Sequence, residues 1–169
     1  QKTSKKITVK TQPIKLNKHI LQRAKDHHFT LLFSWKIRQG LKNGVDPDRI
    51  KKYVDYFWQR DMQSHFREEE EILFAPLHDD KVKRALEEHR QIEQQIKAVL
   101  KDSTGTGMPE QLSLLADEVD EHVRYEEREL FPHIEQSLTE TQLEKIGAQL
   151  ENAPVLEDEY PDEFWTKKK

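Results

Sequence analysis

The chain has 169 residues, of which 36% are charged and 34% hydrophobic, and it carries a formal net charge of −4 and no cysteine. This length suits one domain with a buried core, and the lack of cysteine excludes disulfides, thiolate metal ligands and a cysteine nucleophile. Interspersed charges argue against a nucleic-acid partner. The lack of an apolar run of roughly 18 residues and of a signal peptide argues against a membrane partner. We therefore expect a cytoplasmic protein.

Hydrophobic periodicity and punctuation by glycine and proline predict five helices and no strand. The predicted ranges are 16–42, 46–76, 80–102, 109–136 and a shorter helix after residue 139. Thr139 and Gln142 have the spacing of a capping box at the start of that last helix. Four long amphipathic helices joined by short turns predict an all-α fold, an antiparallel up-down-up-down four-helix bundle with a short fifth C-terminal helix and a tail.

The bundle and its fifth helix are assigned to residues 14–153, between a basic tail at 1–13 and an acidic, aromatic tail at 154–169. Tyr160, Phe164 and Trp165 indicate that part of the last tail packs against the body, whereas the lysine run at 167–169 should lie in solvent.

An internal repeat supports this organisation. HFREEEEILF at 65–74 aligns without gaps to HVRYEERELF at 122–131, and RAKDHH at 23–28 similarly matches RALEEH at 84–89. The chain is therefore interpreted as two related helical hairpins.

The repeat also carries a pattern of metal-binding residue types. A histidine and a glutamate four residues apart lie on one face of a helix, and this spacing occurs on the predicted second and fourth helices. Imidazole nitrogens bind iron, zinc and similar metals, while carboxylates offset the charge and can bridge two ions. With one histidine from each of the other two long helices, the predicted metal ligands are His28, His65, Glu69, His89, His122 and Glu126.

Each of these residues alone has an ordinary structural explanation, such as a hydrogen-bonded core histidine or a solvated glutamate. The prediction depends on their coincidence, because one histidine falls on each of four helices and two have a glutamate at the same offset. His27 competes with His28, and the repeat alignment favours His28, as does the apolar stripe of Leu21, Ala24, Leu31 and Trp35. Asp61 and Glu118, four residues before His65 and His122, are either partners of the ligand rings or surface acids.

This order of motifs resembles the hemerythrin-like, HHE cation-binding family, over about residues 16–138. The resemblance implies a left-handed bundle around an oxo- or hydroxo-bridged pair of iron ions held by the six predicted ligands. Oxygen-carrying hemerythrins have a second histidine four residues before or after that of the third helix, where this chain has Ala85 and Glu93. Ferritin-like bundles use Glu-x-x-His, a spacing that does not occur here.

From these features we predict a non-haem di-iron protein that binds or senses a small ligand such as O2, NO or H2O2, as a monomer or homodimer. Non-catalytic binding is favoured, and oxidase or peroxidase activity stays open. Manganese or zinc could replace iron, because histidine and carboxylate ligands accept all three. The alternatives are an iron storage, sensing or iron-centre repair protein, and a metal-free helical interaction module.

Overall fold

A computed structural model describes residues 18–150 and 159–167 of the chain. The predicted tail at 1–13 lies outside the described residues, as do 154–158 and 168–169 of the predicted C-terminal tail. The prediction of an all-helical fold is confirmed, since the described residues form helices, turns and irregular segments without a strand.

The first hairpin contains α1 (Lys18–Lys42) and a second long rod. Gly44 adopts a left-handed backbone conformation with φ of 67° in the turn after α1. Asp46 then caps α2 by accepting the Asp48 N–H. The rod was predicted as one regular helix, but it consists of α2 (Pro47–Phe57), the π-helical turn η1 (Trp58–Met62), α3 (Gln63–Glu68) and the π-helical turn η2 (Glu69–Leu73).

The second hairpin begins with α4 (Asp80–Lys101), whose first turn is capped by Asp79. A rod of α5 (Met108–Tyr125), the π-helical turn η3 (Glu126–Leu130) and α6 (Phe131–Ser137) follows. The fifth helix, α7 (Glu140–Leu150), begins with the predicted capping box, in which Gln142 N–H donates to Thr139 Oγ1 and Thr139 N–H to Gln142 Oε1.

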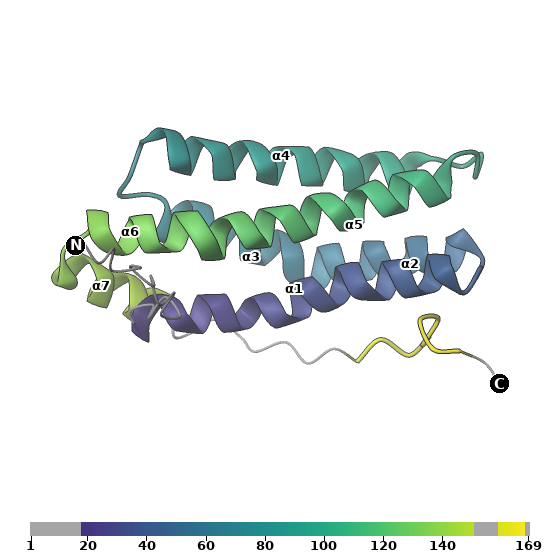
Figure 1. The fold of residues 1–169 in the computed structure, drawn as a ribbon, viewed down its shortest axis with the longest axis horizontal. Coiled ribbons are helices and arrows are strands. Elements are labelled where there is room, and N and C mark those ends of the chain that lie inside the picture. Colours follow the sequence, from purple (N-terminus) through teal and green to yellow (C-terminus); the bar gives the residue numbers. More distant parts are fainter. Residues whose placement is uncertain (1–17, 151–158, 168–169) are drawn as a thin grey trace, which may run out of the picture.

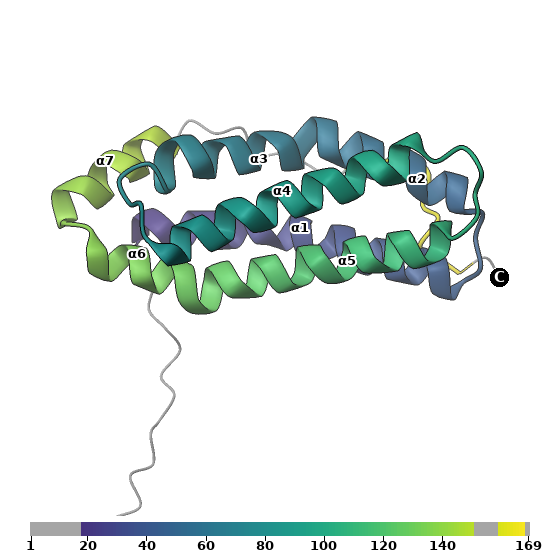
Figure 2. The same cartoon turned by 90° about the horizontal axis from the view of Figure 1, so that it is seen from above.

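Four long rods lie side by side, and successive rods run in opposite directions in both views (Figures 1 and 2). Helix α1 packs along α5, α4 packs along α5, and α7 folds back against α1 and η2. The rods therefore enclose one long interior.

Two hydrophobic clusters fill this interior, separated by a polar layer. Along α1, Ile20 belongs to one cluster and Phe33 to the other, with a buried histidine between them. Along the fourth rod, Val119 and Leu130 belong to different clusters in the same way. The apolar core is therefore interrupted at one level of the bundle.

The described part of the C-terminal tail, residues 159–167, packs against the α1–α2 end of the bundle, as predicted (Figure 1, yellow). Phe164 is buried, and a Cβ on Gly40 would lie 2.8 Å from the Phe164 ring, so glycine is required for this close approach. Arg49 donates to both carboxylate oxygens of Asp162. Lys36 lies 3.9 Å from the centre of the Trp165 ring.

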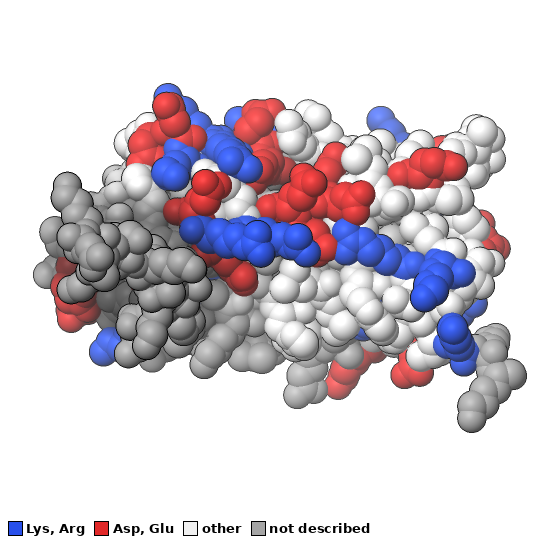
Figure 3. Space-filling view, viewed as in Figure 1, with Lys and Arg blue, Asp and Glu red and all other residues white. Residues whose placement is uncertain are grey.

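Lysine, arginine and acidic side chains are intermixed on the face seen in Figure 3, beside a stretch of uncharged surface. Among the described residues, no helix is both long enough and apolar enough to cross a membrane.

Candidate metal centre

The buried face of α1 differs from the predicted one by one residue. His28 is exposed, and the predicted neighbours Leu31 and Trp35 are 37% and 47% exposed. The face that points into the bundle instead carries residues at three- and four-residue steps that lie one position away: Ile20, Arg23, His27, Thr30, Ser34 and Ile37. The choice of His28 over His27 is therefore corrected, because a helix turned by one residue brings the His27 ring inside and leaves His28 in solvent.

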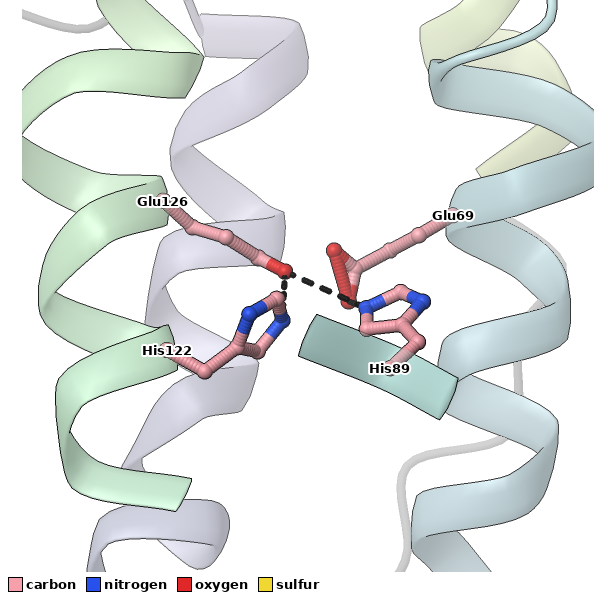
Figure 4. A group of neighbouring side chains, drawn as sticks. All are labelled: Glu69, His89, His122 and Glu126. Carbon is pink, nitrogen blue, oxygen red and sulfur yellow. Dashed lines mark ion pairs between the residues drawn. The ribbon is translucent and has the colours of Figure 1, made fainter. Parts of the chain in front are cut away.

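The other five predicted residues are buried together with His27 in the polar layer. His27, His65 and Glu69 form one group whose ligand atoms lie within 4.8 Å of one another, and Glu69, His89, His122 and Glu126 form a second. Figure 4 shows the four side chains of the second group converging, with His122 and Glu126 from the α5–η3 rod, Glu69 from η2 and His89 from α4. Glu69 belongs to both groups, so they are two halves of one site.

Glu126 links the halves as well. One of its oxygens lies 3.1 Å from His27 Nε2, while the other contacts His122 Nε2 and lies 3.5 Å from His89 Nε2. Glu69 Oε1 lies 2.8 Å from His65 Nε2 and 4.0 Å from His89 Nε2. Each carboxylate thus lies between a histidine of the first hairpin and one of the second. Two imidazoles per half with two shared carboxylates form a donor set suited to two metal ions.

The polar atoms at this layer are poorly satisfied by the protein itself. Among the described residues, the Nε2 atoms of His65, His89 and His122 and all four carboxylate oxygens of Glu69 and Glu126 are buried without a hydrogen-bond partner. Their contacts with one another lack hydrogen-bond geometry, and a buried polar group without a hydrogen bond costs roughly 1–3 kcal/mol, or more when it is charged. Metal ions bonded to these atoms would remove the cost, so the residues present fit a metal centre.

Carboxylates next to the site fix the outer side of three rings. His27 Nδ1 lies 3.2 Å from Glu127, His89 Nδ1 3.3 Å from Glu70, and His122 Nδ1 3.0 Å from Glu88. A ring that donates Nδ1–H outward presents its Nε2 lone pair inward, as a metal ligand requires.

The sequence-based prediction of these outer partners was incomplete. Glu118 was interpreted either as a partner of the His122 ring or as a surface acid. In the structure Glu88 lies at His122 Nδ1, and one Glu118 oxygen is buried without a hydrogen-bond partner in the described part of the chain. For Asp61 both interpretations, a partner of His65 and a surface acid, stay open. Glu70 and Glu127 could have been found from the repeat, since each directly follows a predicted ligand glutamate.

Two π-helical turns begin at the shared carboxylates. Glu69 is the first residue of η2 and Glu126 the first residue of η3. A π-helical turn replaces the i→i+4 bond by an i→i+5 bond, as in Phe74 N–H to Glu69 O at 2.8 Å. Such turns concentrate at functional sites, and here both coincide with the residues shared by the two halves.

Burial lowers the pKa of the histidines in the layer, whereas Glu69 and Glu126 raise it. Burial opposes the charged form of His27 and His122, but Glu126 and neighbouring glutamates outweigh it and raise the pKa of His27 to about 9 and that of His122 to about 10. For His65, burial dominates and Arg23 adds to it, so its pKa falls to about 4 despite the attraction of Glu69. The histidines around Glu126 hold the pKa of that carboxyl well below its usual range, although burial acts in the other direction.

Comparison with protein-family profiles matches residues 18–135 to the hemerythrin HHE cation binding domain. The match covers more than half of the chain, and the protein belongs to this family of cation-binding helical domains. No curated protein and no solved structure matched the chain.

Proposed function

We propose that the chain holds two iron ions at this centre and uses them to bind or sense a small ligand such as O2, NO or H2O2. The observation that carries the proposal is the sharing of Glu69 and Glu126 between two pairs of buried histidines. A single metal ion would leave one pair of rings and two carboxylate oxygens unsatisfied in the apolar interior. Two ions use the whole donor set.

In this arrangement His27 and His65 would hold one ion, His89 and His122 the other, and the two glutamates would lie between both. Iron in such a site supplies redox chemistry and coordination positions for an added ligand. Glu127, Glu70 and Glu88 hold ring protons on the outer side and so keep the inner nitrogens available. The hydrophobic clusters on both sides limit access of water to the layer.

The test is metal analysis of protein loaded with ferrous iron under anaerobic conditions, followed by absorption spectra before and after exposure to air. We expect two iron ions per chain and a new ligand-to-metal absorption band on aeration. Parallel loading with manganese and zinc reports metal preference. Protein that holds no stoichiometric metal after this loading excludes the proposal.

A second candidate function, iron sensing, is favoured by the way in which the layer splits the core. Without metal, the cations that compensate the two buried carboxylates within the described residues are protonated histidines and Arg23, so the layer should loosen. Hydrogen exchange of iron-loaded and metal-free protein tests this function. A sensor should lose protection across α4 and α5 when iron is removed, whereas a ligand binder should keep its fold.

The remaining alternative is a metal-free interaction module. It differs from the metal-binding proposals in the effect that it predicts when histidines of the layer are replaced. Replacing His65 and His122 by leucine should stabilise such a module, because two poorly satisfied polar rings would be exchanged for apolar side chains. If the polar layer exists to hold metal, the double variant should lose metal and should not gain stability relative to the loaded wild type. Thermal unfolding of both proteins distinguishes these outcomes.

A further inference from the structure

The tail segment, residues 159–167, lies on the α1–α2 end of the bundle in the manner of a bound peptide (Figure 1). Phe164 is its anchor, since this side chain is 1% exposed and its ring lies against Gly40 on α1. An added Cβ on Gly40 would lie 2.8 Å from that ring and 3.0 Å from Ile50 Cδ1 on α2. The missing side chain at Gly40 therefore leaves a notch between α1 and α2, and one aromatic ring fills it.

Aromatic and charged contacts to α2 surround this anchor. The ring of Tyr160 lies against those of Tyr53 and Tyr56, with centres 5.1 and 4.9 Å away. Arg49 Nε and Nη2 donate to the two carboxylate oxygens of Asp162 at 3.0 and 2.6 Å. A two-point contact of this kind fixes the orientation of the partner as well as its charge. The surface thus recognises a second aromatic ring and an acidic side chain.

Trp165 completes the contacts on the side of α1. Lys36 is buried, and its ammonium group lies 3.9 Å from the centre of the Trp165 ring. The side-chain amide of Asn43 donates to the Trp165 carbonyl at 3.2 Å. The tail segment carries three acidic residues and one lysine, whereas the surface beneath it presents Lys36 and Arg49. The charges of the two sides are therefore complementary in sign.

The residues that make these contacts are close together in the sequence. All of the anchoring side chains fall within residues 160–165. Phe164 N–H donates to the Asp162 carbonyl and Thr166 N–H to the Glu163 carbonyl, so the segment also forms its own tight turn. A short peptide therefore carries everything that the surface recognises, without the rest of the chain.

The tail segment should be held much less strongly than the helices are held to one another. Among residues 159–167, only Phe164 has a buried side chain. The side chains of the Arg49–Asp162 pair are 34% and 41% exposed, and ion pairs at such positions contribute little. Docking should be favoured roughly 100-fold, the size that burial of one phenylalanine supplies. The segment can therefore open while the bundle stays folded.

We propose that the α1–α2 end of the bundle is a binding site for acidic, aromatic peptides of the pattern Tyr-x-Asp-x-Phe-Trp, which the chain's own tail segment occupies reversibly. A partner that carries this pattern takes the place of the tail segment when it opens. The contacts belong to the hydrophobic cluster on one side of the polar layer, so peptide binding should not depend on metal at the centre.

A fluorescently labelled peptide of residues 159–167, added to the full chain, tests the proposal by anisotropy. Phe164→Ala in the chain removes the anchor of its own tail segment and leaves the notch intact. The effective concentration of a linked segment is about 1 mM, so docking favoured roughly 100-fold corresponds to a peptide Kd of about 10 μM for this variant. The wild-type chain should bind the peptide roughly 100-fold more weakly, because its own tail segment competes.

Further substitutions, each combined with Phe164→Ala in the chain, test the geometry. Gly40→Ala fills the notch and should raise the peptide Kd at least about tenfold. Arg49→Gln removes the two-point contact and should raise it about threefold. Lys97→Gln is the matched control, because it removes a cation that is 67% exposed on α4 and should leave the Kd unchanged. A peptide in which alanine replaces Phe164 should not bind.

Circular dichroism of each variant reports whether it folds. If Phe164→Ala does not fold, the double variant Asp162→Asn, Trp165→Ala takes its place, since both side chains are partly exposed. Its peptide Kd should be about tenfold below that of the wild type, because an ion pair and a cation–π contact of the competing tail segment are lost. A folded variant that shows no saturable binding, or the same Kd as the wild type, overturns the inference. Unchanged binding after Gly40→Ala overturns it as well.

Discussion

The two hairpins of this molecule build the same half-site with different surroundings. In both, the residue after the shared glutamate reaches across to the other hairpin, where Glu70 meets His89 and Glu127 meets His27. In both, a π-helical turn begins at the shared glutamate. The repeat in the sequence is therefore also a repeat of contacts.

The equivalence fails at several positions that are not ligands, and two of them adjoin the polar layer. Arg23 in the first hairpin corresponds to Ala85 in the second, and Phe66, whose ring stacks on His89 at 3.9 Å, corresponds to Val123. The ring of His65, on the side of Arg23, has a lowered pKa, whereas that of His122 has a raised one. Histidines that are equivalent in sequence thus differ in electrostatic environment.

The largest expected effect comes from removing a residue that both halves share. Glu126→Gln keeps the size of the side chain but removes the charge that adjoins His27, His89 and His122. Both ions should be lost, because the two positions share this carboxylate, and iron analysis should find less than one ion per chain. Glu129→Gln is the control, since Glu129 is exposed on the same π-helical turn and pairs with Arg84.

A Glu126→Gln variant that still binds one ion tightly would show that the halves are independent. Binding of both ions would show that Glu69 alone can link them. Either result would contradict the inference that both halves of the site depend equally on Glu69 and Glu126.

The all-helical fold and most of the layer could be predicted because they depend on local patterns. Capping residues fixed the helix starts, and the His-x-x-x-Glu spacing places both side chains on one face irrespective of the rest of the molecule. Five of six predicted ligand positions lie together in the layer for this reason.

The error on α1 has a tertiary cause. Apolar residues occur all around this helix, so Leu31 and Trp35 compete with Phe33 and Ile37 for the inner face, and periodicity cannot decide between them. The inner face includes polar residues that only distant contacts stabilise. Lys36 is buried under Trp165, a residue of the C-terminal tail more than a hundred positions away. The π-helical turns were not predicted either, because their sequences also suit an α-helix.

A smaller loss of metal is expected when a single histidine ligand is replaced. This test decides which of the two neighbouring histidines on α1 is the ligand. His27→Leu should remove the ion of the first half and lower its affinity more than about 100-fold, since even outer partners of metal ligands contribute 10- to 100-fold. His28→Leu should leave both ions bound, because His28 is exposed. Competition with a chelator of known iron affinity measures the difference. Equal loss in both variants would contradict the position of His27 in the structure.

The smallest effect is the pH dependence of the stability of the metal-free protein, which should differ in sign between His65 and the pair of His27 and His122. His27 and His122 have folded-state pKa values of about 9 and 10, above the ordinary 6.5, so the stability that they contribute is present below pH 6.5 and lost as the pH rises through 9 to 10. His65 has a folded-state pKa of about 4, so its contribution is lost as the pH falls from 6.5 to 4. Glu126 has a lowered pKa and loses its contribution in acid as well.

Chemical unfolding of the metal-free protein should therefore show greatest stability near pH 6.5. Between pH 7 and 9 the free energy of unfolding should fall by about 2 kcal/mol, the size for one such histidine, because His27 and His122 share Glu126 and their contributions do not add. Metal-loaded protein is the control, since metal binding releases these protons and should remove the decline. Replacing both His27 and His122 by leucine should also flatten the alkaline side, and an unchanged slope in this double variant would show that the buried histidine charge is held elsewhere in the bundle.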